Sequence, residues 1–218
     1  MEPFKTLVDR AAPLMLSNVD TDVIIRIERL TAPDQTVLGH YAFEALRYRP
    51  DGSENPDFVL NSAPYRGASI LLAGPNFGCG SSREAAVTAL MGLGIRCVIA
   101  PSFGDIFFGN CFQNGLLPIR LSEPEVSALA RQAVAGEPFT IDLQAQVVIV
   151  GGEQHPFDID SQRRESLLAG LDDLGLTLMQ LDRIRAWQAA DRQSRPWVWE
   201  PVAIIADPKS SSSVENPR

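Results

Sequence analysis

Two adjacent serines, an arginine and three glycines stand close together in one segment of the chain, Gly-Pro-Asn-Phe-Gly-Cys-Gly-Ser-Ser-Arg-Glu at 74–84. The apolar run at 68–73 predicts a buried strand before this segment, and the residues at 85–91 predict a helix after it. A glycine-rich turn between a strand and a helix directs backbone N–H groups and the positive end of the helix dipole to one point. The segment is therefore typical of an anion site, and the guanidinium of Arg83 favours a carboxylate or a phosphate.

The same segment is compatible with a purely structural role. Ser81 with Glu84 three positions later fits a capping box, in which both side chains satisfy amides at the start of a helix. A dinucleotide site is disfavoured, because Gly78 and Gly80 begin the pattern G-x-G-x-x-G but Arg83 occupies its last position. No Gly-Lys-Ser/Thr follows, which excludes a P-loop. An anion site and a helix cap both stay open, and the same amides could serve both.

Length and composition favour one globular domain. The chain has 218 residues, of which 45% are hydrophobic and 21% charged, so it can bury a sizeable core. We expect a single domain over 1–205 and a disordered, serine-rich tail over 206–218. The sequence has no long apolar run for a membrane span and no secretory leader, so we expect a cytoplasmic protein. A net charge of −8 argues against a nucleic-acid surface.

The three cysteines, Cys79, Cys97 and Cys111, are an odd number without a C-x-x-C pair, as in a reduced cytosolic protein. Their irregular spacing does not match an iron–sulfur motif, and only His40 and His155 could add ligands. No histidine is near Cys79 in the sequence to activate it as a nucleophile. We therefore expect the chain to bind no metal by itself.

Strands alternate with helices in the first two-thirds of the sequence, which predicts an α/β core with a parallel sheet. A long irregular connection is expected over 48–64, where prolines and glycines are frequent. Strands are predicted at 14–16, 23–25, 70–72, 97–99, 117–119, 139–143, 147–150 and 157–159. Helices are predicted after Ser81, after Ser102 up to Gly115, after Ser122 up to Gly136, over 161–169 and over 178–192.

Beyond these local patterns, several motifs resemble those of one known family, the small subunit of 3-isopropylmalate dehydratase, also called isopropylmalate isomerase. In aconitase, the equivalent region is the last, swivelling domain. The resemblance spans about residues 4–193 in the order and spacing of the family, and it implies a swivelling β/β/α domain with a largely parallel sheet core. The motifs are GCGSSRE at 78–84, VIAPSFGDIF at 98–107, NCFQNGLLP at 110–118, NVDTD at 18–22, FDID at 157–160 and GLDDLGLTL at 170–178.

The resemblance also implies an activity. The family interconverts 2-isopropylmalate and 3-isopropylmalate by dehydration and rehydration in leucine biosynthesis. It is a hydro-lyase that is active only with a large subunit, which holds a [4Fe-4S] cluster. This chain would thus work in a heterodimer or higher heteromer, bind a hydroxy-acid substrate, and hold no cofactor of its own.

Individual site residues follow from the same resemblance. Ser81 is implied as the catalytic base, working as an alkoxide, and Arg83 and Ser82 are implied to bind a substrate carboxylate. Thr21 and Asp22 match positions that line the cleft. Keeping a serine ionised near neutral pH requires roughly 8 kcal/mol, which the helix N-terminus, the arginine and backbone donors must supply. The backbone donors implied for this role are the N–H groups of Gly78, Cys79 and Gly80.

Departures from the family pattern leave the substrate open. Residues 85–88 read Ala-Ala-Val-Thr where the family has His-Ala-Pro-Trp. The segment 27–43, which carries the substrate-recognition loop in the family, lacks the usual Thr-Gly-Phe-Gly pattern. A related hydro-lyase acting on another malate, such as citramalate or 2,3-dimethylmalate, is therefore an alternative. A non-enzymatic module that binds an anion or a partner is a third, against which the intact Ser-Ser-Arg motif counts.

Overall fold

The computed structural model describes residues 1–31 and 37–199. The chain divides into two compact units, Met1–Leu176 and Thr177–Arg218. The boundary between them comes earlier than residue 205, where we expected the domain to end, and the extent of a single domain stays a prediction. The tail predicted over 206–218 lies outside the described residues.

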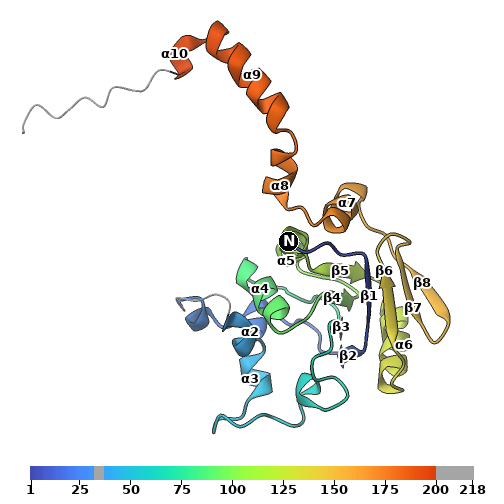
Figure 1. Cartoon of the computed structure of the whole chain (residues 1–218). Helices are drawn as coiled ribbons and strands as arrows, with labels where there is room; N and C mark the ends of the chain where they lie inside the picture. Colours follow the sequence, from blue (N-terminus) through green and yellow to red (C-terminus); the bar gives the residue numbers. More distant parts are fainter. Residues whose placement is uncertain (32–36, 200–218) are drawn as a thin grey trace, which may run out of the picture. The chain divides into compact units, whose positions relative to one another are not determined.

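A four-stranded parallel sheet forms the centre of the first unit (Figure 1). Its two central strands, β3 and β4, are buried at every residue. Because both faces are covered, these strands are apolar throughout and do not alternate. The predicted parallel core is confirmed. In spatial order the strands are β2 (Ala11–Leu14), β3 (Ile70–Ala73), β4 (Cys97–Ala100) and β5 (Leu117–Arg120).

A second, antiparallel sheet packs against one face of the parallel sheet. Strands β6 and β7 alternate buried and half-buried residues, so that one side of this sheet faces the core. Ile70 and Leu72 of the parallel sheet share a buried cluster with Phe139 and Ile141 of β6. In spatial order the antiparallel strands are β1 (Thr6–Asp9), β6 (Phe139–Asp142), β7 (Val147–Val150) and β8 (Glu153–Pro156).

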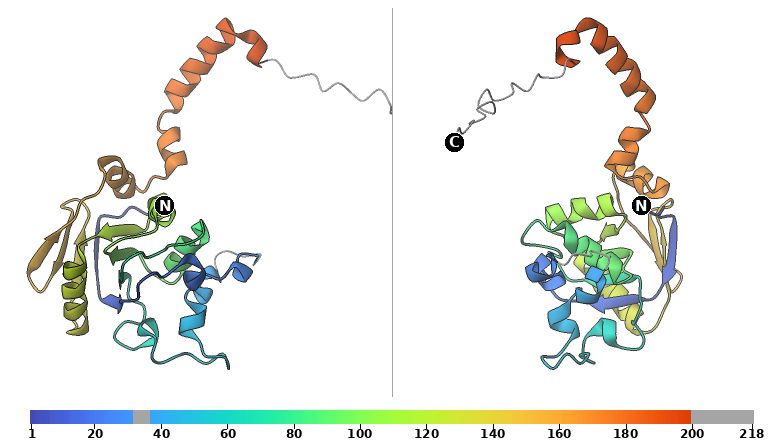
Figure 2. Two further views of the ribbon diagram at one scale, coloured as in Figure 1. Left: turned by 180° about the vertical axis from the view of Figure 1, so that it is seen from behind. Right: turned by 60° about the vertical axis from the view of Figure 1, so that its left-hand side comes forward.

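Helices cover the opposite face of the parallel sheet, which completes a β/β/α arrangement. Leu71 and Val98 point to this side and share a second buried cluster with Ile24, Leu38 and Leu90. Figure 2 shows both sheets and the helices of this unit from two further directions. The elements that contribute helical residues to this cluster are α1 (Thr21–Ile24), α2 (Leu38–Tyr41), α4 (Glu84–Gly92) and α5 (Asp105–Asn114).

Helix ends follow the predicted capping chemistry in several places. Helix α6 (Glu123–Val134) begins with a capping box, in which Glu125 accepts a hydrogen bond from the N–H of Ser122 at 2.8 Å. Helix α5 ends at Gly115, whose φ of 90° is the left-handed conformation that glycine adopts readily. Helix α7 (Ser161–Ala169) begins at the predicted residue, and its first turn is capped by the carboxylate of Asp160.

Three predicted strands differ from the structure. The run at 23–25 belongs mostly to helix α1, because the Asp20 carboxylate accepts from the N–H of Val23 at 2.7 Å and caps the helix. A short apolar run buried on all sides does not by itself distinguish a strand from a helix. The strand expected at 14–16 lies at 11–14, and the one expected at 157–159 lies at 153–156. Strand β1 was not predicted from the sequence.

The connection predicted over 48–64 is irregular, as expected, but it is well packed. Asn61 is 7% exposed, and its amide donates to the carbonyls of Arg47 at 2.7 Å and Asn55 at 2.9 Å. Phe58 and Leu60 are buried in the core. The short helix α3 (Glu44–Arg47) directly precedes this connection, and η3 (Val59–Asn61) lies within it. A further short helix, η1 (Ile27–Arg29), comes earlier in the chain.

The second unit is helical where the structure describes it. Helix α8 (Asp173–Leu178) crosses the boundary, and α9 (Leu181–Ser194) and α10 (Pro196–Trp199) follow. Asp191 accepts from Nε1 of Trp199 at 2.9 Å and from Nε of Arg195 at 2.7 Å, which ties α10 to α9. Within the two described ranges, no helix combines the length and apolar character needed to cross a membrane.

Candidate active site

Three loops meet at the carboxyl ends of strands β2, β3 and β4, where ligands bind in open α/β sheets. The N–H of Gly78, after β3, donates to the carbonyl of Val19, after β2, at 2.7 Å. The N–H of Phe77 donates to the carbonyl of Ser102, after β4, at 3.0 Å. These backbone bonds hold the glycine-rich turn between its two neighbouring loops.

The glycines of this turn are required by its geometry. Gly78 and Gly80 have φ values of 70° and 86°, in the left-handed region. A Cβ atom on Gly78 would lie 2.2 Å from Cγ of Phe107. The ring of Phe107 in turn lies 5.5 Å from that of Phe77, edge to face. The turn therefore packs on aromatic side chains, which fix its position relative to the sheet.

Ser81 and Ser82 are exposed at the end of this turn. The capping box proposed for Ser81 is contradicted, because α4 begins at Glu84 with Arg83 in the N-cap position. The Glu84 carboxylate does not reach back to Ser81 but accepts from the side-chain amide of Asn114 at 3.0 Å. Ser81 therefore precedes the helix by three residues, and a cap does not explain its presence.

Thr21 supports this turn from inside the protein. The residue is 1% exposed, and its hydroxyl donates to the carbonyl of Ser81 at 3.0 Å. Its N–H donates to the carbonyl of Cys79, also at 3.0 Å. Thr21 lies beneath the backbone that carries Ser81, and a direct substrate contact by Thr21 stays a prediction.

Arg83 and Asp22, both predicted site residues, form an ion pair between Nη1 and Oδ1. The Arg83 side chain is only 12% exposed, whereas Asp22 is 53% exposed. Nη1 also donates to the carbonyl of Ile25 at 3.4 Å. In the part of the chain that the structure describes, Nε and Nη2 have no partner, so a carboxylate could bind to these two donors side by side.

The predicted backbone donors divide into two groups. Gly78 is contradicted as a donor, because its N–H is already bound to Val19; its contribution is the conformation of the turn. The N–H of Cys79 is directed to the carbonyl of Val19 by the parallel bridge between Asp20 and Cys79, whereas the N–H of Gly80 makes no hydrogen bond to any residue in the described ranges. Within those ranges, Gly80 is therefore the predicted donor that remains available beside Ser81.

The cysteines do not form a metal site with one another in the described structure. Cys97 and Cys111 are buried, and burial raises the pKa of both thiols, so they stay protonated. Cys79 is half-buried. Among residues 1–31 and 37–199, no group of three or more His, Cys, Asp or Glu side chains is placed to hold a metal ion.

The segment expected to recognise the substrate is stabilised by an ion pair that was not predicted from the sequence. Nε of Arg29 donates to Oε2 of Glu44 at 2.9 Å, and the guanidinium lies 4.3 Å from the ring centroid of Tyr41. The hydrogen bond from Arg29 lowers the pKa of Glu44, against the opposing effect of burial. Fifteen residues separate the two charges, so no local pattern points to the pair. Residues 32–36 of the segment lie outside the described structure.

The same segment packs closely on the helix that follows the glycine-rich turn. A Cβ atom on Gly39 of α2 would lie 2.2 Å from the carbonyl carbon of Gly92 of α4. This close approach brings 38–41 onto the helix that begins beside Arg83. A cavity of about 620 Å³, lined among others by Arg26, Glu44 and Tyr48, lies beside the segment.

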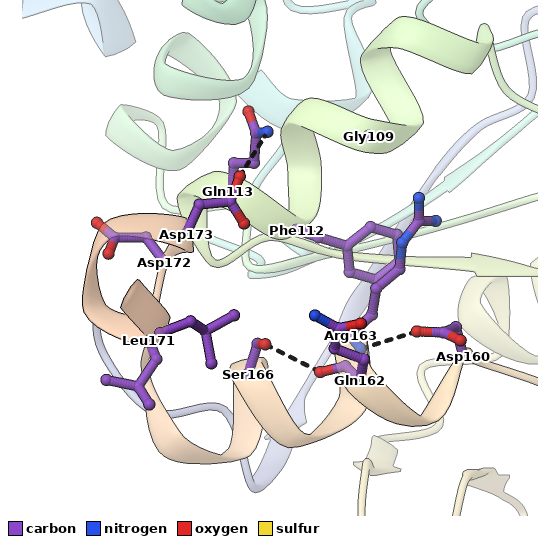
Figure 3. Close-up of a pocket in the computed structure, with 11 residues that line it drawn as sticks. Gly109, Phe112, Gln113, Asp160, Gln162, Arg163, Ser166, Leu171, Asp172 and Asp173 are labelled. Atoms are coloured by element: carbon purple, nitrogen blue, oxygen red, sulfur yellow. Dashed lines mark hydrogen bonds between the residues drawn. The ribbon is translucent and has the colours of Figure 1, made fainter. Parts of the chain in front are cut away.

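Figure 3 shows another cavity, of about 300 Å³, between α5, α7 and residues 171–176. Its walls include Phe112, over whose ring the Arg163 guanidinium lies at 4.7 Å, and the side chain of Gln113, which donates to Asp173 at 3.3 Å. None of the predicted site residues lines it. This cavity is separate from the Ser-Ser-Arg motif.

Comparison with known proteins agrees with the motifs. Family models match successive parts of the chain: the Aconitase C-terminal domain at 1–124, LeuD_N at 127–161, and the C-terminal domain of the 3-isopropylmalate dehydratase small subunit at 173–198. The 3-isopropylmalate dehydratase small subunit of Rhodospirillum centenum is 54% identical over 90% of this chain and 98% of its own length. That of Gluconacetobacter diazotrophicus is 52% identical over 90% of this chain and 97% of its own length.

A solved structure shows the same fold. The crystal structure of 3-isopropylmalate dehydratase (leuD) from Methanocaldococcus jannaschii superimposes with a TM-score of 0.64 at 28% sequence identity. The match covers 83% of this chain and 99% of that one. Together with the curated relatives and the family models, it shows that this chain belongs to the family of 3-isopropylmalate dehydratase small subunits.

Proposed function

We propose that this chain is the small subunit of a 3-isopropylmalate dehydratase, a hydro-lyase that interconverts 2-isopropylmalate and 3-isopropylmalate in leucine biosynthesis. The observation that carries the proposal is the Ser81–Ser82–Arg83 motif at the carboxyl ends of the parallel strands, with Asp22 holding the arginine. About half of the residues are identical to those of named small subunits over nine-tenths of the chain. The enzyme works in the cytoplasm with a large subunit.

Ser81 is the base that takes the proton from the substrate carbon. In this chain the Ser81 side chain is exposed to water, where ionising a serine near neutral pH costs roughly 8 kcal/mol. Helix α4 begins only at Glu84, so its dipole acts on Ser81 less than a direct cap would allow. The N–H of Gly80, which has no partner among the described residues, and the charge of Arg83 supply more of the stabilisation, and they do so once water is excluded. A partner must therefore cover this face before the reaction can occur.

Arg83 positions the substrate. Asp22 engages one edge of the guanidinium, which leaves Nε and Nη2 directed to a substrate carboxylate. The planar guanidinium orients a carboxylate bidentately, which a lysine in its place could not do. The exposed hydroxyl of Ser82 donates a further hydrogen bond to the same carboxylate.

The iron–sulfur cluster belongs to the large subunit. The thiols of this chain do not suit such a cluster, because Cys97 and Cys111 are buried in the core with raised pKa values and Cys79 stands alone at the surface turn. Bound in the large subunit, the cluster supplies a Lewis acid for the departing hydroxyl group. This chain contributes the base, the carboxylate clamp and the backbone donor.

Replacing Ser81 by alanine tests the proposal. In the complex with the large subunit, Ser81→Ala should lower kcat for 3-isopropylmalate by ~10²–10⁴, the range for a general base. Ser82→Ala is the matched control, since it removes the neighbouring hydroxyl and should mainly raise KM. Thermal unfolding of each variant separates lost chemistry from lost stability. A Ser81→Ala complex with normal turnover would refute the assignment.

The identity of the substrate is tested by comparing kcat/KM for several malates. The segment 27–43 departs from the leucine-pathway pattern, so citramalate and 2,3-dimethylmalate should be compared with 3-isopropylmalate in the same reconstituted complex. We expect the highest kcat/KM with 3-isopropylmalate, in line with the named relatives. A preference for either smaller malate would reassign the substrate and leave the roles of Ser81 and Arg83 intact. Failure with all three would favour a binding module.

A further inference from the structure

The described part of the second unit, residues 177–199 (here the C-terminal arm), has the composition of an interface. All three tryptophans of the chain lie in it, at 187, 197 and 199, together with four arginines. Of the thirteen large apolar side chains that are exposed among the described residues, five fall within 178–198. Tryptophan and arginine are the residues most enriched where protein interfaces gain their affinity. These five side chains are Leu178 (54% exposed), Met179 (69%), Trp187 (57%), Trp197 (67%) and Val198 (56%).

The main helix of the arm is poorly supported by its own residues. Helix α9 has 14 residues, and Asp191 is the one buried residue within it. Isolated helices of this length are marginal in water, because helical stability in proteins comes chiefly from the packing of an apolar face. The hydrogen bonds of Asp191 to Trp199 and Arg195 join α10 to α9, and within the described part of the arm no other residue of α9 is buried.

One side of α9 carries a hollow suited to a partner's side chain. Gln180, Arg183, Ile184 and Trp187 line a cavity of about 390 Å³. These positions are spaced i, i+3, i+4 and i+7, so they form a single helix face. An aromatic side chain beside such a hollow is the usual form of an anchor residue.

We propose that the C-terminal arm docks on the large subunit, an inference that rests on the proposed function. Separate family models match the catalytic part, as an Aconitase C-terminal domain at 1–124, and the arm region, as the C-terminal domain of the small subunit, at 173–198. A domain joined covalently to its partner benefits from an effective concentration near the millimolar range. A separate subunit lacks this advantage and needs additional contact area.

The exposed side chains of the arm can supply that area. Five large apolar side chains, each more than half exposed, offer on the order of 500 Å² of accessible surface. A standard interface buries ~800 Å² of accessible surface on each partner. Ser81 and its neighbours belong to the other unit, so docking through the arm adds contacts without using catalytic residues. Of the four arginines of the arm, Arg195 is paired with Asp191, and the other three suit carboxylates on a partner surface.

Binding of the purified iron–sulfur large subunit to Trp187→Ser tests the proposal. Loss of an anchor tryptophan costs about 2 kcal/mol or more, so Kd should rise by roughly 30-fold or more, measured by calorimetry. The large-subunit concentration that gives half-maximal turnover should rise by the same factor. Gln193→Ser is the matched control, because Gln193 lies on the opposite side of α9 from Ile184 and should leave Kd unchanged.

Hydrogen exchange of the unmodified chain gives an independent measurement. Amides of 181–194 should exchange rapidly in the isolated chain and become protected when the large subunit is added. Unchanged Kd for Trp187→Ser, or amides that are already protected in the isolated chain, would overturn the proposal. A dimer of this chain that Trp187→Ser converts to monomer would instead assign the arm to a second copy. A tight complex without turnover would refute the proposed function and leave the arm's role standing.

Discussion

The hydroxyl of Thr21 offers a sharp test of how the fold holds Ser81, the proposed base. It donates to the carbonyl of Ser81 at 3.0 Å, and the residue is 1% exposed. Thr21→Val replaces this hydroxyl by a methyl group of similar size, whereas Thr21→Ser keeps the hydroxyl and removes a buried methyl group. The two variants therefore separate hydrogen bonding from packing at one position.

The expected effects have different magnitudes. A hydrogen bond of this kind contributes about 1 kcal/mol. Its loss therefore lowers the population of the turn conformation that positions Ser81 by about fivefold. A displacement of the base by about 1 Å costs up to ~100-fold in rate. We expect Thr21→Val to lower kcat by about 5- to 100-fold and to lose about 1 kcal/mol of stability with the hydrogen bond. Thr21→Ser should lose about 1 kcal/mol of stability, the value of one buried methyl group, and retain most of its activity.

Steady-state kinetics of the reconstituted complex and urea unfolding of the isolated chain measure the two effects. A positioning role requires that kcat falls in Thr21→Val and is largely kept in Thr21→Ser, although both variants lose about the same stability. A Thr21→Val enzyme with normal kcat would refute a positioning role. Equal loss of kcat in both variants would show that packing of the methyl group holds Ser81 as much as the hydroxyl does.

Two further predictions concern the turn and the recognition segment. Gly78→Ala should destabilise the fold by about 1–3 kcal/mol more than Gly67→Ala in urea unfolding, because both have positive φ but only the first would also contact Phe107. Equal costs would contradict the close approach. Glu44→Gln should lower Tm slightly at pH 7 and progressively less at lower pH: Arg29 depresses the pKa of Glu44 in the folded state, so its stabilisation is present above the unfolded pKa of about 4.3 and lost as pH falls through the folded value. A difference in Tm that does not shrink as the pH falls below about 4.3 would contradict this linkage.

Much of the candidate site could be predicted from local sequence. The run at 70–73 is apolar at every position, which is the pattern of a strand buried on both faces, and the structure has it as a central parallel strand. The glycines at 78 and 80 indicated a turn between a strand and a helix, and both have positive φ there. The cap at Ser122 and the left-handed Gly115 depend on residues next to them in sequence, so they were also predictable.

Other features depend on contacts between segments that are far apart in the sequence. The helix at 21–24 replaced a predicted strand because packing against the core, together with the Asp20 cap, overrides a short apolar pattern. The N–H of Gly78 donates to the carbonyl of Val19, which lies 59 positions earlier in the chain, and so does not face a ligand. Such bonds depend on which loops the parallel strands bring to the same edge of the sheet. The spatial order of the strands cannot be predicted from any single local segment.

The sequence by itself determined the chemistry, because side-chain types and their spacing around 78–84 are local properties. The tertiary structure alone decided how those groups are used: Asp22 engages Arg83 across 61 positions, and Thr21 supports the carbonyl of Ser81 across 60. Neither contact has a short-range signal, since each forms only when the loops after β2 and β3 meet at the edge of the sheet. Long-range packing thus converts a motif into a site.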